Sequence, residues 1–346
     1  MADNTTIEWT QATWNPTTGC DRVSGGCDNC YALTLAKRLK AMGSPKYQTD
    51  GDPRTSGPGF GVATHEDTLV DPLGWGTPRR IFVNSMSDLF HEAVPDDFIA
   101  RVFAVMALSP QHTFQLLTKR HGRMRSLLSG GPEYAWIVPR HTSPFVQAVY
   151  EEARKLRPGG PLMRWPLPNL WLGVSVEDQK WADIRIPALL DTPAAVRWLS
   201  CEPLLGPVDI SRYLWLTGAS TAGPFYDFAG RRRGGAGGIG GQAFTSVPAR
   251  DLHWVVVGGE SGHSARPMHP DWARSLRDQC VRAEVAFFFK QWGAWAPGDR
   301  NGWYSRSHWV DDGTGGNEAF MYAPRSKSLR ELDGRTWDQY PEAVNA

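Results

Sequence analysis

The chain has no long hydrophobic run. No apolar stretch approaches the roughly 18 residues of a membrane-spanning helix, and the first six residues do not show the basic-then-apolar pattern of a secretory leader. Bulk charge is also lacking, because 37 Lys and Arg balance 36 Asp and Glu to a net charge of +1. We therefore expect a cytoplasmic protein without a membrane span, in which any nucleic-acid binding relies on local basic patches.

Cysteine is scarce, and its distribution is uneven. There are five Cys in 346 residues, an odd number that argues against a disulfide-stapled secreted scaffold. Three of them, Cys20, Cys27 and Cys30, fall within eleven residues of one glycine-rich segment. Glycine allows the tight turns with positive φ that bring three thiolates around one point. The segment therefore predicts a metal or iron–sulfur site.

The number of ligands narrows the kind of site. Clusters that only transfer electrons are generally closed by four cysteines, whereas three would leave one iron of a 4Fe-4S cluster open to a substrate or cofactor. Structural zinc also needs four ligands, and the next histidine, His65, is distant in the sequence. Three interpretations stay open: a cluster with an open iron, a zinc site completed by a distant residue, and redox-active thiols without a metal.

Short apolar runs alternate with helical or loop segments along the chain. Such continuous apolar runs are typical of strands buried on both faces of a parallel sheet. We predict strands within 7–14 and at 80–87, 113–119, 170–176, 196–203, 253–260 and 286–291, and helices at 32–42, 95–108, 144–156, 181–190 and 270–284. The alternation predicts an α/β fold, a partial or complete TIM-like (β/α) barrel with parallel strands and loop insertions. A doubly wound open sheet is the alternative.

The barrel is expected to occupy residues 1–295. Insertions interrupt it at about 43–78, 129–168 and 214–250, of which the first is predicted to be a loop lid and the last is rich in Gly and Arg. Residues 296–346 are expected to form a loop-rich C-terminal extension that packs on the barrel.

Polar side chains follow the ends of the predicted strands. In βα barrels the carboxyl ends of the strands form the reactive face, so these side chains would line one mouth that faces the three cysteines. The strand-end residues are Asn84, Ser85, Asp88, Lys119, Arg120, Ser175, Glu177, Cys201, Glu202 and Glu260.

Several motifs resemble those of a bacteriophage-associated family that is described by its three-Cys motif. The matching segments are WNPTTGC at 14–20, NSMSDLF at 84–90, LTKR at 117–120, GVSVE at 173–177, CEPL at 201–204 and GGESG at 258–262. More broadly, Cys-x6-Cys-x2-Cys followed by Tyr31 resembles the cluster motif of radical S-adenosylmethionine (SAM) enzymes, in which the usual first spacing is three residues.

The resemblance to radical SAM enzymes implies a 4Fe-4S cluster on Cys20, Cys27 and Cys30, with an open iron that chelates the amino and carboxylate groups of SAM. It also implies a partial TIM-like barrel and an electron donor such as flavodoxin or ferredoxin. Cofactor-binding roles are then expected for strand-end residues, namely Asn84, Ser85, Asp88, Ser175, Glu177, Glu202 and Glu260.

Two strand-end residues are candidates for catalysis. Lys119 would hold the carboxylate of SAM or a phosphate, and Cys201 would donate a hydrogen atom or act as a fourth cluster ligand. Each has a structural alternative. Lys119 could form an ion pair with a strand-end glutamate, and Cys201 could be a small buried thiol of the core.

Basic residues gather after the third predicted strand. Arg120, Arg123 and Arg125 are therefore candidate contacts to DNA or RNA phosphates. The phage association of the similar family, and the precedent of spore photoproduct lyase, a radical SAM enzyme that repairs DNA, favour a nucleic-acid substrate for repair or modification.

The leading hypothesis is thus a radical SAM-like enzyme that abstracts hydrogen from a nucleic-acid substrate. One alternative is a non-catalytic iron–sulfur or zinc protein that binds nucleic acid or a protein partner in a phage-related function. Another is a metal-independent barrel hydrolase that uses Asp88, Glu177, Glu202 and Glu260.

Overall fold

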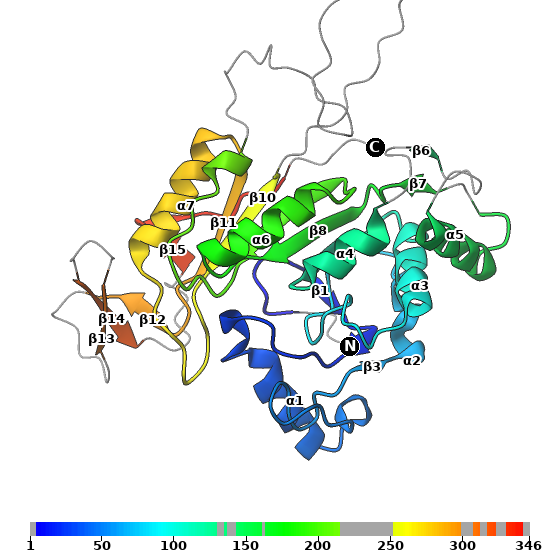
Figure 1. Ribbon diagram of the computed structural model, residues 1–346, viewed down its shortest axis with the longest axis horizontal. Helices are drawn as coiled ribbons and strands as arrows, with labels where there is room; N and C mark the ends of the chain where they lie inside the picture. Colours follow the sequence, from blue (N-terminus) through cyan, green and yellow to red (C-terminus); the bar gives the residue numbers. More distant parts are fainter. Residues whose placement is uncertain are drawn as a thin grey trace, which may run out of the picture.

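A seven-stranded parallel sheet lies at the centre of the protein (Figure 1). The computed structural model describes residues 5–129, 135–136, 143–160, 163–214, 252–298, 307–311, 317–322 and 330–341. In spatial order the strands are β1 (Ala12–Trp14), β4 (Arg80–Val83), β5 (Thr113–Thr118), β8 (Leu170–Ser175), β9 (Val196–Cys201), β10 (Trp254–Gly258) and β11 (Ala286–Gln291).

The strand order decides between the two predicted architectures. Neighbours in the sheet follow one another along the chain, and each neighbouring pair is parallel. A doubly wound sheet instead reverses its order at a switch point. The α/β fold with a curled half-barrel sheet, a partial TIM-like barrel, is therefore confirmed.

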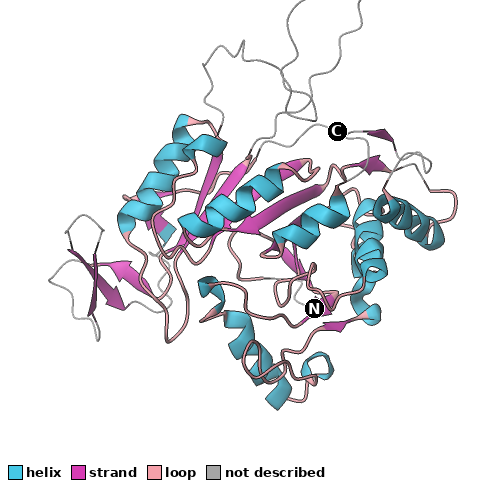
Figure 2. Cartoon of the chain, viewed as in Figure 1, coloured by secondary structure: helices cyan, strands magenta, loops and turns pink. Residues whose placement is uncertain are grey.

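Helices follow the strands and cover the outer face of the sheet (Figure 2). They are α2 (Glu66–Leu69), α3 (Asp96–Ala107), α4 (His121–Leu128), α5 (Pro144–Leu156), α6 (Gln179–Leu190) and α7 (Pro270–Arg282). Helix α1 (Tyr31–Ala41) lies apart from the sheet (Figure 1) and packs in a separate apolar cluster with Tyr47, Phe60 and Met86. Among the helices that the structure describes, none combines the length and the apolar character needed to span a membrane.

Local capping sets several helix starts. Ser143 accepts from the backbone N–H of Val146 at the start of α5, which also has a proline at its first position. The predicted start of α6 was two residues late, because the side chain of Asp178 accepts from the Trp181 N–H and begins the helix at Gln179. The strand predictions ran one to four residues past the carboxyl ends of β4, β5, β8, β9 and β10.

Smaller elements occupy the insertions and the C-terminal part. β2 (Thr17–Thr18) pairs with β3 (Ala63–Thr64), and β6 (Ala135–Trp136) pairs with β7 (Arg164–Trp165). Short 3-10 turns are η1 (Gly25–Cys27), η2 (Pro45–Tyr47), η3 (Asp71–Gly74) and η5 (Ser211–Tyr213). β12 (Trp295–Pro297), β13 (Ser307–Asp311) and β14 (Asn317–Tyr322) form an antiparallel sheet, and β15 (Glu331–Leu332) pairs with β16 (Arg335–Thr336). The predicted Gly/Arg-rich stretch lies outside the described residues.

The inner face of the sheet carries an aromatic cluster. Trp198 and Trp254 lie with their ring centroids 5.2 Å apart, and Trp9 and Trp171 pack against them at 5.3 and 5.6 Å. Gly173 makes room for this packing, because a Cβ there would come within 2.5 Å of the Trp198 ring. The predicted core positions of Trp171, Trp198 and Trp254 are confirmed. The cluster fills the amino-terminal half of the sheet interior and leaves the polar strand ends at the other edge.

The C-terminal segment covers the free edge of β11. The Phe289 N–H donates to the Trp337 carbonyl at 2.9 Å, and the Gln339 N–H donates to the Phe287 carbonyl at 3.2 Å. Next to them, the ring of Tyr340 packs on Trp254. Capping an exposed strand edge in this way satisfies backbone groups that would otherwise pair with another chain.

Candidate functional site

The cysteine loop, residues 19–31, lies across the carboxyl ends of the strands. It leaves β2, makes the 3-10 turn η1 and enters α1, where Cys30 occupies the N-cap position. All three cysteines are half-buried. Gly19 begins the loop at φ +85°, and a Cβ there would overlap the Gly61 carbonyl, so the turn requires glycine.

Glu177, just after β8, binds the first half of the loop. Its buried carboxylate accepts from the Ser24 hydroxyl at 2.7 Å, and Gly26 sits so close that a Cβ would lie 2.5 Å from the Glu177 Cγ. Two cations hold the same carboxylate, Arg185 at 2.7 Å and Lys119. Burial by itself raises the pKa of Glu177, but these two cations outweigh it and keep the pKa below its ordinary value. Glu177 is therefore ionised at neutral pH.

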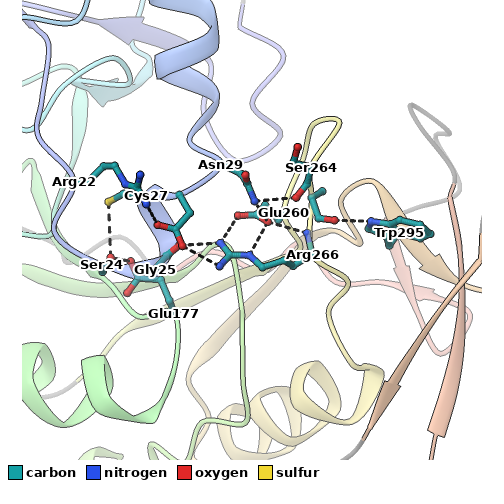
Figure 3. A network of polar contacts seen from close by, with 12 residues as sticks. Arg22, Ser24, Gly25, Cys27, Asn29, Glu177, Glu260, Ser264, Arg266 and Trp295 are labelled. Carbon is teal, nitrogen blue, oxygen red and sulfur yellow. Dashed lines mark hydrogen bonds and ion pairs between the residues drawn. The ribbon is translucent and has the colours of Figure 1, made fainter. Parts of the chain in front are cut away.

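Glu260, just after β10, binds the second half of the loop (Figure 3). Its carboxylate accepts from the Asn29 side-chain amide at 3.0 Å and from the guanidinium of Arg266 at 2.6 and 2.9 Å. Burial opposes ionisation here as well, yet the hydrogen bonds from Arg266 and Asn29 lower the pKa of Glu260. Two predicted strand-end carboxylates thus bind the cysteine loop directly.

The 43–78 insertion and the segment after β4 bind the start of the loop. Asp21 accepts from His91 at 2.9 Å, from Ser56 at 3.1 Å and from the Thr55 hydroxyl. At the other end of the loop, the Tyr31 hydroxyl donates to the Ser85 carbonyl. The loop is therefore attached to four separate parts of the fold, and its cysteines are held in defined places.

The protein environment keeps the thiols of Cys20 and Cys30 protonated in the absence of a metal. Burial raises the pKa of Cys20 to about 12, with further contributions from the nearby Asp88 and Cys27, and Arg120 opposes the shift. Burial also raises the pKa of Cys30. Metal binding at this loop would release protons, because only thiolates bind metal strongly.

Cys20, Cys27 and Cys30 supply three thiol donors, the ligand type that iron–sulfur clusters use. Within the described ranges, no three His, Cys, Asp or Glu side chains converge on a position for a single metal ion. A four-iron cluster instead binds each cysteine through a different iron, so its ligands need not converge on one point. Three half-buried thiols on one loop suit such a cluster.

Asn84 has unsatisfied hydrogen-bonding capacity beside this loop. It directly follows β4, takes φ +61° and is 3% exposed. Neither its amide nitrogen nor its amide oxygen has a hydrogen-bond partner among the described residues. A buried amide without partners is costly, of order 1–3 kcal/mol per group, and left-handed backbone outside glycine is uncommon and typical of functional sites. Asn84 is thus free to bind a ligand.

The other predicted cofactor-binding residues lie at the same edge but already have partners. Ser85 hydrogen-bonds with Asn15 at 3.2 Å, and Asp88 accepts from the Thr118 hydroxyl at 2.7 Å. Glu202 forms an ion pair with Lys290 at 2.8 Å and accepts from Ser200 at 3.2 Å. Ser175 is buried, and its backbone carbonyl accepts from Arg185 at 2.9 Å.

The two candidate catalytic residues match their structural alternatives. Lys119 pairs with Glu177, the strand-end glutamate of that alternative. Cys201 is fully buried in the core between the sheet and the helices, where burial raises its pKa well above the ordinary value. Cys280 of α7 is buried in the same core.

The three candidate phosphate contacts do not form one open patch. Arg123 donates to the carbonyls of His91 and Val94 and pairs with Asp96, so it holds the turn before α3. Arg120 donates to the Asp21 carbonyl at 3.4 Å, and Arg125 lies 3.7 Å from Asp191.

Four residues of the site were given no role in the sequence analysis. Ser24, Arg185, Arg266 and Lys290 all bind a strand-end carboxylate. Lys290 ends an apolar strand run, as the predicted residues do, and that signal was visible in the sequence. The other three lie on a loop, a helix and a loop, where their approach to a carboxylate depends on tertiary structure.

Comparison with known protein families shows which family the chain belongs to. Residues 4–341 match a family described as "Protein of unknown function (DUF5131)". The chain belongs to this family. No curated protein matches the chain.

A search of solved structures finds a distant likeness. The chain is similar to "Spore photoproduct lyase complexed with dinucleoside spore photoproduct", with 10% identity and a TM-score of 0.32. The alignment covers 89% of this chain and 67% of the other. A likeness at this TM-score carries no information about chemistry.

Proposed function

We propose that this protein is a radical SAM-type iron–sulfur enzyme. The observation that carries the proposal is the cysteine loop: three half-buried thiols on one segment, fastened across the carboxyl ends of a parallel half-barrel. In βα barrels this edge is where reactive groups gather. A turn that only connects two elements does not require three cysteines or hydrogen bonds to four separate parts of the fold.

Cys20, Cys27 and Cys30 would hold a 4Fe-4S cluster with one open iron. When bound, the cluster would supply the electron for reductive cleavage of SAM, which starts hydrogen abstraction from a substrate. The amide of Asn84, which lacks partners among the described residues, would bind polar groups of SAM or of the substrate. An external donor such as flavodoxin or ferredoxin would supply the electron.

The remaining residues would position the site and exclude water. Glu177 and Glu260 would hold the cysteine loop in place rather than bind SAM themselves, since their oxygens already accept protein hydrogen bonds. The Glu202–Lys290 pair would offer the substrate a carboxylate and an ammonium group at the inner strand ends. Trp198 and Trp254, packed below, would close the interior to solvent.

The proposed substrate class remains a nucleic acid or nucleotide. Arg125 is the most exposed of the three candidate arginines, with a side chain that is 53% accessible, and its ion pair with Asp191 is long at 3.7 Å. Exchange of such a weak surface pair for a phosphate contact costs little. A salt-dependent binding measurement with single-stranded DNA would test this part of the proposal.

The decisive experiment is anaerobic reconstitution with iron and sulfide. We expect about four irons per chain, an EPR signal after dithionite reduction that changes when SAM is added, and formation of 5′-deoxyadenosine. Cys27→Ala should lose the signal, and Cys280→Ala, which alters a core thiol, should keep it. A signal indifferent to SAM would favour a non-catalytic iron–sulfur protein, and stoichiometric zinc without iron would refute the proposal.

A further inference from the structure

The guanidinium of Arg266 contacts the cysteine loop on both sides of Cys27 (Figure 3). Nη2 donates to the Gly25 carbonyl at 2.8 Å, and Nη1 lies 3.4 Å from an Asp28 carboxylate oxygen. Gly25 begins the η1 turn and Asp28 follows it. One side chain therefore brackets the turn that presents Cys27.

Glu260 fixes the orientation of that guanidinium. It accepts from Nη2 at 2.6 Å, from Nε at 2.9 Å and from the Arg266 backbone N–H at 2.8 Å. A two-point bond between arginine and a carboxylate is directional as well as strong. Glu260 is only 5% exposed, so water competes little for these bonds.

The carboxylate of Glu260 also binds the residue next to Cys30, which is Asn29. The Asn29 amide donates to Glu260 at 3.0 Å and to the Ser264 carbonyl at 2.9 Å, and Asn29 directly precedes Cys30. The 260–266 segment is itself held from outside, because the Trp295 indole donates to the Ala265 carbonyl at 2.7 Å. Arg266, Glu260 and Asn29 thus connect the positions of Cys27 and Cys30 to the end of β10.

We infer that Arg266 is a positioning residue for the cysteine loop and that its positive charge raises the midpoint potential of the cluster that the thiolates hold. The positioning part stands on the contacts alone, and the tuning part rests on the proposed function. A cluster becomes more negative when it is reduced, so a fixed cation nearby favours the reduced form. Lysine keeps the charge but lacks the planar fork, so Arg266→Lys separates the two effects.

Hydrogen–deuterium exchange of the metal-free protein tests the positioning part. Arg266→Gln removes the guanidinium bonds to Gly25 and Glu260, and we expect amides of the cysteine loop to exchange about threefold faster or more. Arg274→Gln is the matched control, because Arg274 pairs with Asp271 and Asp333 and carries the same charge. It should leave the loop unchanged. Wild-type exchange in the loop of Arg266→Gln would overturn the inference.

The midpoint potential of the reconstituted cluster tests the tuning part. We expect Arg266→Gln to shift it to a more negative value and Arg266→Lys to remain near wild type, although its loop exchanges faster. An unchanged potential in Arg266→Gln would refute the tuning role. If the wild-type protein forms no cluster, the proposed function fails, and the exchange comparison still decides whether Arg266 positions the loop.

Discussion

Glu177→Gln should be one of the most destabilising conservative substitutions in the protein. The change keeps the shape of the side chain but removes the negative charge between Lys119 and Arg185. The Arg185 side chain is fully buried and that of Lys119 is 20% exposed, so neither cation can turn to solvent without rearrangement. Removing one partner of a buried ion pair costs about 3–5 kcal/mol, a large share of the stability of most domains.

Urea unfolding of the metal-free protein measures this loss. The midpoint should fall while the slope stays constant, since the native fold is otherwise kept. Glu66→Gln is the matched control: its pair with Arg101 is exposed, and its loss should cost less than about 1 kcal/mol. A free energy of unfolding for Glu177→Gln within about 1 kcal/mol of wild type would show that Lys119 and Arg185 do not depend on this carboxylate.

The effect should also depend on pH. The folded pKa of Glu177 lies below its ordinary value of 4.5, so the carboxylate contributes stability above that pH and loses it as pH falls through the folded value. The difference between wild type and Glu177→Gln should therefore be full at pH 7 and shrink below about pH 4. A difference that stays constant down to acid-induced unfolding would contradict the electrostatic explanation.

Two further substitutions test the packing around the site. Gly26→Ala should press a methyl group on Glu177, which should lower the free energy of unfolding by about 1–3 kcal/mol and reduce iron uptake in a chelator-based assay. Gly122→Ala is the control, because Gly122 has open space around it, and this variant should take up iron as the wild type does. Tyr340→Ala should lower stability by about 1–3 kcal/mol, because its ring lies 5.4 Å from Trp254 and 4.1 Å from the Arg80 guanidinium. Tyr340→Phe keeps the ring, so equal urea midpoints for the two variants would rule out this packing role.

The fold could be predicted because its signals are local. Continuous apolar runs such as that of β10 show strands covered on both faces, and helices such as α5 begin at a recognisable Ser-Pro start. The errors in the predicted strand ends occur where the local sequence pattern no longer shows whether the strand continues. Glu202 and Pro203 were included in the strand because they directly follow an apolar run, although pairing with β10 ends at Cys201.

The site was predicted less completely, for a physical reason. That Glu177 and Glu260 lie at strand ends follows from the sequence, and both residues are at the expected edge. The role of these two carboxylates depends on which side chains contact them in the folded protein. Ser24 and Arg266 lie on loops, and Arg185 lies on α6. No periodic pattern in the sequence predicts that these residues bind the two carboxylates.

The three-cysteine segment, the alternation of strands and helices and the polar strand ends can all be inferred without coordinates, because spacing and periodicity encode them within short windows of the chain. The folded structure was needed to show that the strand-end carboxylates Glu177 and Glu260 bind the cysteine loop, that Lys119 pairs with Glu177 and that Cys201 is part of the core. These outcomes depend on contacts between segments far apart in the chain, such as Asn29 with Glu260, whose energies depend on burial and on mutual orientation.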